Sequence, residues 1–325
     1  MNVLVTGGAG YVGSIVTEEL LKKAHKVIVL DNLEQGHKGA ILAEAEFVSA
    51  DIRDAQALEN VFRRFKIDTV MHMAAETVIE YSMTDPKRYF QNNIVGGMNL
   101  LDTMLKHDVC KIIFSSSAAV YGEPQSIPIE EGHPTIPVNS YGESKLMFER
   151  ILAWYGKAYG LRHIYLRYFN AAGASELLGE DHQPETHLIP NVLKAALNND
   201  NPVPIFGTDY PTKDGSCLRD YVHVVDIAQA HILALEKLEN LSDMVYNLGN
   251  GEGYSVLEVV NIARKVTSVD IPVRISPRRL GDPATLVASS GRAKSDLGWK
   301  PGSPELESII ESAWRWMRKH PDGYR

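Results

Sequence analysis

Residues 2–13 read NVLVTGGAGYVG: an apolar run leads directly into a turn rich in glycine, and a helix-like segment follows. Within the turn, Gly7, Gly10 and Gly13 recur at three-residue spacing, as in a dinucleotide fingerprint. Glycine lets the chain turn tightly, lets the backbone approach a pyrophosphate and lets the helix pack on the strand. The helix N-terminus then presents unpaired N–H groups and a positive dipole end to phosphates. This stretch predicts a dinucleotide-binding α/β fold.

A second apolar run, 27–30, supports this prediction because it ends in Asp31, 18 residues after Gly13. An acidic side chain at this place accepts hydrogen bonds from an adenosine ribose, and its charge repels a 2′-phosphate. The cofactor that the sequence predicts is therefore NAD and not NADP.

The composition narrows the classes of partner. The 325 residues carry a net charge of −8, so we expect no nucleic acid partner and no acidic membrane surface. No apolar run reaches the roughly 18 residues of a membrane-spanning helix, and the first residues resemble a strand more than a signal peptide. Cys110 and Cys217 are too few for a disulfide framework or a cysteine zinc site. We expect a cytoplasmic protein without a bound metal.

Strand-like and helix-like patterns alternate through the first half of the chain, which predicts a doubly wound parallel sheet. The second half has short helical patterns and a loop-like stretch over 198–215. We predict an α/β protein with a Rossmann-type NAD-binding domain over 1–170 and a smaller α/β lobe over 171–325 that closes over the sheet, with later crossings near 216–245. The expected strands are 2–6, 27–30, 46–48, 69–73, 111–114 and 163–166, and the expected helices are 14–23, 55–66, 86–106, 140–156, 188–197, 224–238, 255–266 and 306–320.

Tyr141 and Lys145 form the chain's single Tyr-x-x-x-Lys pair and share one face of a predicted helix. A tyrosine with a pKa of about 10 is a poor base at pH 7, and a nearby ammonium lowers that pKa by favouring the phenolate. Ser117 ends the preceding predicted strand, where a third polar group can meet a substrate hydroxyl. These three side chains are predicted to be catalytic. The alternative is an ordinary surface pair with a strand-end serine.

The order of these motifs resembles the extended short-chain dehydrogenase/reductase family and, within it, the UDP-sugar 4-epimerases. The likeness covers essentially the whole chain. The segments that carry it are 114–122 (FSSSAAVYG), 140–146 (SYGESKL), 166–173 (LRYFNAAG), 205–223 (IFGTDYPTKDGSCLRDYVH), 277–282 (PRRLGD) and 320–324 (HPDGY).

The resemblance implies two sets of binding residues. Beside the glycine turn, NAD would contact Tyr11, Val12, Asp31, Asn32, Asp51, Ile52, Asn92, Tyr141, Lys145 and Tyr168. The UDP-sugar would contact Ser117, Tyr141, Asn170, Leu188, Phe206, Arg219, Arg279, Asp282 and Leu286. An acidic protein needs local cations to hold a diphosphate, and the guanidinium fork suits phosphate oxygens. Ordinary ion pairs of the two arginines with Asp220 or Asp282 are the alternative.

The activity that the resemblance implies is interconversion of UDP-galactose and UDP-glucose. Tyr141 would act as base during transient NAD-dependent oxidation at C4, the 4-keto sugar would rotate, and hydride would return to its other face. The resemblance also implies a homodimer joined by a four-helix bundle, for which 89–106 and 148–159 have apolar residues to spare.

Other activities within and outside the family remain to be weighed. Ala118 and Ala119 stand where the similar 4,6-dehydratases carry an Asp-Glu pair, and alanine cannot transfer a proton. This argues against a dehydratase and a uronate decarboxylase. Activity as a UDP-glucuronate or UDP-N-acetylglucosamine 4-epimerase is an alternative within the family. A noncatalytic NAD-binding regulator is the alternative from a different class of protein.

Three positions bear on how closely the family pattern applies. Thr77 occupies a place where some epimerases carry a lysine near the cofactor phosphates, and His187 stands where an asparagine commonly contacts the substrate diphosphate. The resemblance places Leu286 in the wall of the sugar pocket. Relatives with a large tyrosine at this position resemble enzymes restricted to plain hexoses, and relatives with a small residue also accept N-acetylhexosamines. Leucine is intermediate in bulk, and a core position away from the sugar is the alternative.

Overall fold

The computed structural model describes residues 1–198, 202–241, 243–279 and 282–324. Its centre is a seven-stranded sheet in the order β11-β6-β5-β4-β1-β2-β3, and every neighbouring pair is parallel. This is the strand order of a doubly wound nucleotide-binding fold with one strand added beyond β6. The predicted fold class is confirmed. The strands are β1 (Asn2–Thr6), β2 (Lys26–Asp31), β3 (Glu46–Ser49), β4 (Thr69–His72), β5 (Lys111–Ser117), β6 (Arg162–Tyr168) and β11 (Met244–Leu248).

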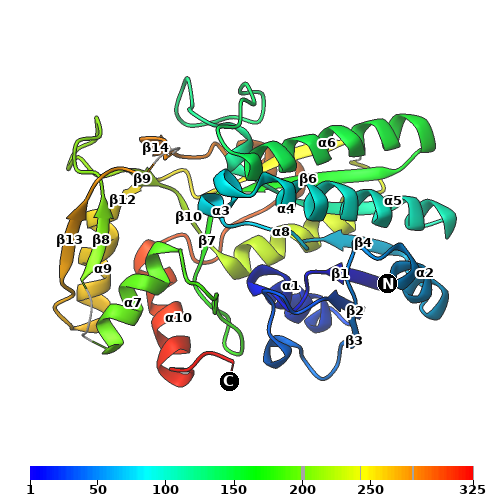
Figure 1. The fold of residues 1–325 in the computed structure, drawn as a ribbon, viewed down its shortest axis with the longest axis horizontal. Helices are drawn as coiled ribbons and strands as arrows, with labels where there is room; N and C mark the ends of the chain where they lie inside the picture. The colour runs from blue at the N-terminus through cyan, green and yellow to red at the C-terminus, as the bar shows by residue number, and fades with distance from the viewer. Residues whose placement is uncertain (199–201, 242, 280–281, 325) are drawn as a thin grey trace.

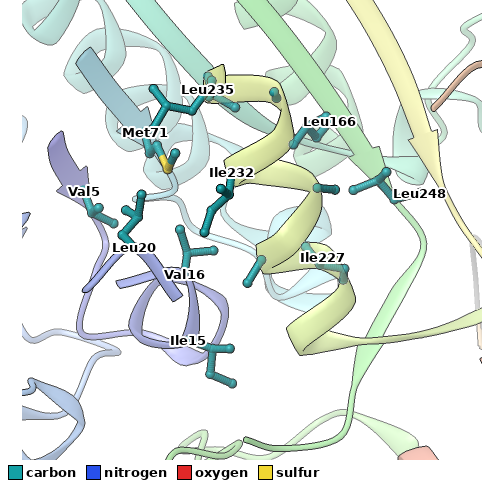
Figure 2. Packing of buried hydrophobic residues seen from close by; sticks show 14 of the residues in the cluster. Val5, Ile15, Val16, Leu20, Met71, Leu166, Ile227, Ile232, Leu235 and Leu248 are labelled. Atoms are coloured by element: carbon teal, nitrogen blue, oxygen red, sulfur yellow. The ribbon is translucent and has the colours of Figure 1, made fainter. Parts of the chain in front are cut away.

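Helices cover both faces of this sheet (Figure 1). The central strands are buried on both faces, as parallel strands between helix layers must be. Figure 2 shows how Leu20 of α1, Met71 of β4 and Ile232 of α8 meet in one apolar cluster. The opposite face packs against α2, α5 and α6 in a second cluster. The helices of the two layers are α1 (Tyr11–Lys22), α2 (Ala55–Arg64), α3 (Ile79–Thr84), α4 (Pro86–Phe90), α5 (Gly97–Lys106), α6 (Ser140–Tyr159) and α8 (Val224–Lys237).

A smaller group of elements lies beyond the carboxyl edge of the sheet, at the left of Figure 1. Three helices and a two-stranded parallel ladder enclose a third apolar cluster there, which includes Trp316 and Val260. Further short ladders of two and three strands belong to this group and do not pair with the seven-stranded sheet. Its elements are β7 (Asn170–Ala172), α7 (Leu188–Asn198), β8 (Val203–Phe206), β9 (Leu218–Arg219), β10 (Tyr221–His223), β12 (Tyr254–Ser255), α9 (Val256–Thr267), β13 (Val273–Ser276), β14 (Thr285–Leu286) and α10 (Leu306–Lys319).

The structure also departs from the sequence-based expectations. The predicted loop over 198–215 was wrong at β8, while its residues 199–201 lie outside the described part of the chain. α3 and β11 were not predicted. The helix expected over 86–106 is present but includes a π-helical segment, Gln91–Gly96. Within the described residues, no helix is both long and apolar enough to cross a bilayer.

Candidate active site

The glycine turn after β1 is built for close contact between backbone segments. Gly7 has φ of +73°, and a Cβ at this residue would lie 2.6 Å from the backbone N of Ala74. A Cβ at Gly13 would lie 2.1 Å from the carbonyl oxygen of Gly7. Gly10 caps α1 without a side-chain hydrogen bond, so the first-turn N–H groups of Tyr11 and Val12 face outward from the helix end. The turn therefore fits a bound pyrophosphate.

Two acidic residues stand at the carboxyl ends of the neighbouring strands. Asp31, the last residue of β2, accepts backbone hydrogen bonds from Ala9 at 3.0 Å and Leu33 at 2.8 Å. Burial raises the pKa of Asp31, and these two N–H groups oppose the shift. Asp51 follows β3 and accepts a hydrogen bond from Asn32 Nδ2 at 2.9 Å. Asp31 and Asn32 are thus fixed beside the glycine turn, as a ribose site requires.

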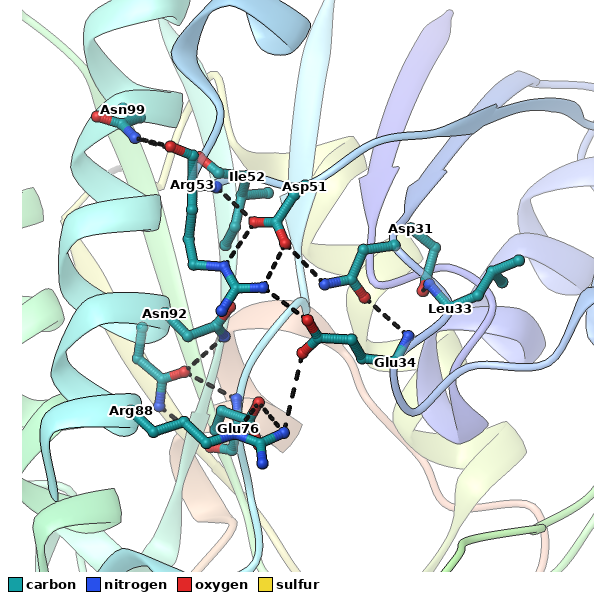
Figure 3. A network of polar contacts seen from close by, with 12 residues as sticks. Asp31, Leu33, Glu34, Asp51, Ile52, Arg53, Glu76, Arg88, Asn92 and Asn99 are labelled. Atoms are coloured by element: carbon teal, nitrogen blue, oxygen red, sulfur yellow. Dashed lines mark hydrogen bonds and ion pairs between the residues drawn. The ribbon is translucent and has the colours of Figure 1, made fainter. Parts of the chain in front are cut away.

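A chain of alternating charges crosses the loops at this edge (Figure 3). Arg53 Nη2 lies 2.5 Å from Asp51 Oδ2 and 2.7 Å from Glu34 Oε1. Arg88 Nη2 lies 3.8 Å from Glu34 Oε2 and 2.8 Å from Glu76 Oε1. Arg53 lowers the pKa of Asp51 to about 2. Because the sheet order is β4-β1-β2-β3, this charge chain joins the loops after β3 and β4 across the end of β1.

The other residues predicted to contact the cofactor lie around the same edge. Ile52 is buried against Gly96 of the π-helical segment. Asn92 is buried in that segment, and its Nδ2 donates to Asn93 Oδ1 at 3.0 Å. Tyr11 donates its hydroxyl to the Gly173 carbonyl at 2.6 Å. Thr77 follows β4 in the loop that also carries Glu76.

Tyr141, Lys145 and Ser117 come together at the carboxyl end of β5. Tyr141 and Lys145 occupy the first two turns of α6, and Lys145 Nζ lies 5.9 Å from the centre of the Tyr141 ring. Ser117 ends β5 and pairs in register with Tyr168 at the end of β6. Burial raises the pKa of Tyr141, and a hydrogen bond with Ser117 opposes that shift. The predicted proximity of the three side chains is therefore present, while their catalytic roles stay predictions.

Lys145 is held by groups that the sequence did not identify. Its Nζ donates to the Ser115 carbonyl at 2.9 Å, and the residue is 4% exposed. Burial lowers the pKa of Lys145 to about 7, and the Glu149 carboxylate one turn later opposes the shift. Glu149 is itself paired with Arg167 at 2.5 Å, in a buried site. The sequence did contain a signal for this contact, because Glu149 follows Lys145 by four residues and therefore lies one helical turn later.

A second group of charges lies in the smaller group of elements. Arg219 Nη2 lies 3.4 Å from Asp282 Oδ1, and Arg279 Nε lies 3.0 Å from Asp282 Oδ2. Arg279 also stacks over the Phe206 ring, 4.7 Å from its centre. The carboxylate alternative proposed for Arg219 and Arg279 therefore exists, with Asp282 shared between them. One carboxylate between two guanidinium groups leaves a net positive charge that suits a diphosphate.

Leu286 lies on β14, beside the strand that carries Arg219. It pairs with Arg219 across the β14–β9 ladder and packs against a small cluster that contains Ala118. Asn170 begins β7 and donates its Nδ2 to the Asp220 carbonyl at 3.0 Å. Leu188 begins α7 directly after His187. The predicted substrate residues thus come from seven separate segments of the chain, β5, α6, β7, α7, β8, β9 and the stretch that leads into β14.

His187 belongs to a cluster that the sequence prediction missed. One ligand atom each from Glu180, His182, Glu185 and His187 lies within 4.8 Å of the others. Burial opposes a charge on His187, but the Glu180 carboxylate outweighs it and raises the pKa of His187 to about 9. The nearby Arg279 guanidinium acts in the opposite direction and lowers the pKa of the same imidazole. The spacing His182-x-x-Glu185-x-His187 was the signal in the sequence.

The sheet order, the glycine turn and the Tyr141/Lys145 pair at its edge define a class, the dinucleotide-binding α/β proteins. A model of the NAD dependent epimerase/dehydratase family matches residues 3–249, and the chain belongs to this family. It is therefore an NAD-dependent enzyme.

Relatives of known name extend the likeness over the whole chain. A UDP-glucose 4-epimerase of Halalkalibacterium halodurans is 53% identical, covering 100% of this chain and 98% of that protein. A crystal structure of a UDP-glucose 4-epimerase is similar with a TM-score of 0.97 and 47% identity, and both chains are covered to 100%. The crystal structure of the UDP-glucose 4-epimerase of Bifidobacterium longum in complex with NAD+ and UDP is similar with a TM-score of 0.95 and 40% identity. The match covers 99% of this chain and 100% of that one.

Proposed function

We propose that the chain interconverts UDP-galactose and UDP-glucose by inversion at C4 of the hexose. The observation that carries the proposal is the joint position of Ser117, Tyr141 and Lys145 at the sheet edge that also holds the glycine turn. The names of relatives at 53% and 47% identity over whole chains support the same activity. The alternatives as a UDP-glucuronate epimerase or a regulator have no comparable support.

In this proposal each side chain has one task. Tyr141 takes the proton of the sugar 4-hydroxyl, Ser117 orients that hydroxyl by hydrogen bonding, and Lys145 favours the phenolate by its charge. NAD, when bound, supplies reversible hydride transfer at C4. When hydride returns, Tyr141 gives the proton back to the 4-oxygen, so both side chain and cofactor are regenerated. Ala118 and Ala119 offer no second acid for loss of water.

The cofactor and substrate are proposed to bind to different parts of the chain. Residues 1–170 together with α8 and β11 form the layered sheet, and the glycine turn, Asp31 and Asp51 lie on it. The remaining segments carry Arg219, Arg279 and Asp282, which we assign to the UDP diphosphate. The two free cysteines are consistent with the cytoplasm as the compartment.

A homodimer is proposed from the exposed apolar side chains on the helices of one sheet face. Val95 and Met98 on the π-helical segment and α5, and Trp154 and Tyr159 on α6, are all exposed, Trp154 by 68%. Single exposed apolar residues need no explanation, but several on adjacent helices favour an interface. A second copy of α5 and α6 packed on this face would complete a four-helix bundle.

The direct test incubates the purified chain with UDP-galactose, without added NAD, and separates the products by chromatography. The proposal expects UDP-glucose to appear until equilibrium is reached. Denaturing the protein should release a dinucleotide into the supernatant. Absence of turnover both with and without added NAD would contradict the proposed function.

A further inference from the structure

The loop between β7 and α7 contains a compact set of metal-binding side chains. Residues 173–187 have neither helix nor strand, yet Glu180, His182, Glu185 and His187 bring their ligand atoms within 4.8 Å of one another. Three of these residues fall within six positions of the sequence. Metal sites formed by such short spacings are common, because one loop can then wrap one ion.

The donor atoms face a common centre. Glu180 Oε1 contacts Nδ1 of both histidines, at 3.1 Å from His182 and closer to His187. Glu185 Oε2 lies 3.9 Å from His182 Nδ1, and its Oε1 lies 3.8 Å from His187 Nδ1. Ligand atoms of a tetrahedral zinc site stand about 3.3–3.5 Å apart, given zinc–ligand distances of about 2.0–2.2 Å. The distances between donor atoms in the cluster, 3.1 to 3.9 Å for three of the pairs, lie on both sides of that range, so small side-chain shifts would bring them to it.

Glu185 supplies an independent observation. Its side chain is 5% exposed, and Oε2 is buried without a hydrogen-bond partner. The nearest cationic group besides the histidines is Lys194 Nζ, at 3.9 Å. A buried carboxylate oxygen without a hydrogen bond is costly, since its desolvation is not compensated. A cation at the centre of the cluster would compensate it.

We propose that Glu180, His182, Glu185 and His187 bind one divalent transition-metal ion, with Zn²⁺ the best fit. Two imidazoles and two carboxylates form a neutral site around a divalent ion. Imidazole donors favour zinc and its neighbours over Mg²⁺ and Ca²⁺, which prefer oxygen ligands only. Binding replaces any proton on the histidines, because only a neutral imidazole nitrogen can be a ligand.

The position of the cluster indicates what the ion does. The His182 ring lies edge-on to the Tyr11 ring, 6.1 Å between centres, at the start of α1. His187 immediately precedes Leu188, the first residue of α7. An ion bound here ties the second part of the loop together, between Tyr11 of α1 and the start of α7. We infer that the metal is structural and holds the loop in place, and that it takes no part in proton or hydride transfer.

The test measures metal binding directly on the full chain without a histidine tag. After incubation with Zn²⁺ and gel filtration, we expect about one zinc per chain by elemental analysis. With Co²⁺ in place of Zn²⁺, a tetrahedral nitrogen and oxygen site should give visible d–d absorption. Zn²⁺ should also raise the thermal unfolding midpoint, because an ion that binds the folded state stabilises it.

Two variants remove one ligand each. His182→Asn and Glu185→Gln should weaken zinc binding more than about 100-fold, since even changes outside the ligand set cost about 10–100-fold. The matched control is His107→Asn, which removes a histidine outside the cluster, whose Nε2 lies 3.2 Å from Glu59 Oε2 beside the ion pairs of Glu59 with Arg63 and Lys106. It should keep one zinc per chain and the same Co²⁺ spectrum.

The proposal is overturned if the unchanged chain holds no stoichiometric Zn²⁺ or Co²⁺ after gel filtration. It is also overturned if His107→Asn loses as much metal as His182→Asn. If the variants at the cluster fail to fold, the stoichiometry and the Co²⁺ spectrum of the unchanged chain still decide. These measurements do not depend on turnover, so they stand apart from the proposed epimerase activity.

Discussion

Lys145 lies one helical turn after Tyr141 on α6, with its Nζ 5.9 Å from the centre of the Tyr141 ring. The same ammonium donates to the Ser115 carbonyl at 2.9 Å, so its position is fixed from the sheet side. In the chain itself, burial raises the pKa of Tyr141, and it is Ser117 that opposes the shift. In the proposed mechanism Tyr141 is the base, and its pKa must then fall below the value that burial imposes.

Replacing Tyr141 by Phe removes the proton acceptor and keeps the ring. We expect kcat to fall by about 10²–10⁴-fold, the usual contribution of general acid–base catalysis. The Kd for UDP should change little, because the arginines assigned to the diphosphate lie on other elements. Tyr159→Phe, at the exposed end of the same helix, is the control and should retain kcat. Near-normal turnover in the Tyr141 variant would exclude this residue as the base.

Replacing Lys145 by Met removes a positive charge next to Tyr141. The pKa of Tyr141 should rise, so the limb of the pH–kcat profile that reports its deprotonation should move to higher pH. A neighbouring opposite charge typically shifts a pKa by about 1–3 units, which sets the expected displacement. Lys265→Met, in an exposed ion pair with Glu307, should leave the profile in place. An unmoved limb in the Lys145 variant would remove the electrostatic role of Lys145.

The parallel sheet could be predicted because its signals are local. Continuous apolar runs mark strands that are buried on both faces, and the glycine turn and Asp54 mark the starts of α1 and α2. Asp54 accepts from the N–H groups of Gln56 and Ala57, as a helix cap does. β11 was not predicted, because its sequence, Met244–Leu248, is short and follows a region read as helix and loop. Its place beside β6 depends on tertiary contacts.

The candidate site was predictable to the extent that it consists of sequence motifs. The pair Tyr141/Lys145 and the acid Asp31 lie at motif positions, and the structure places them where the doubly wound fold binds ligands. Glu34 is a single charge in a loop and Arg88 a single charge in α4, and nothing in the sequence shows that they meet. Their contact depends on the order of β4, β1 and β2 in the sheet, which spacing alone does not give.

Glu34 pairs with both Arg53 and Arg88 and so connects the two halves of the charge chain. This chain lies at the edge of the sheet where we propose that NAD binds. Glu34→Gln removes two exposed ion pairs, each worth about 0.2–1 kcal/mol, so it should accelerate release of bound NAD by about 2–30-fold. Raised salt should speed release from the unchanged protein more than from the variant. Release can be followed by the dinucleotide that passes an ultrafiltration membrane. Glu176→Gln, which breaks an exposed pair with Arg315, is the control. Equal release rates in all three proteins would show that the charge chain does not retain NAD.

Trp154→Glu should convert the proposed dimer into single chains. The side chain is 68% exposed on α6, and burying a glutamate in an apolar interface costs the desolvation of its charge. Light scattering at micromolar concentration gives the mass of each species. Ile275→Glu introduces the same charge at an exposed apolar position of β13, outside the proposed bundle, and should keep the mass of the dimer. A single-chain mass for the unchanged protein would contradict the proposal itself.

Leu286 decides, in our hypothesis, which sugars enter the site. It pairs with Arg219 on one side and packs toward Ala118 on the other, which supports a place between diphosphate and hexose. We expect UDP-galactose and UDP-glucose to be the main substrates, with weak turnover of UDP-N-acetylglucosamine. Leu286→Ala should raise the ratio of kcat/KM for the acetylated over the plain sugar by up to about 10–200-fold, if the relieved clash is worth about 1–3 kcal/mol.

Steady-state kinetics with both sugars measure this ratio for the two proteins. The control is Ile129→Val, a smaller change in the buried cluster against which Leu286 packs. It tests whether loosened packing alone alters selectivity, and we expect the ratio to stay within a few-fold of the unchanged protein. If the unchanged protein handles both sugars equally well and Leu286→Ala leaves the ratio where it was, leucine at this position does not limit the acetamide. Any selectivity between the plain and the acetylated sugar would then have to come from residues other than Leu286.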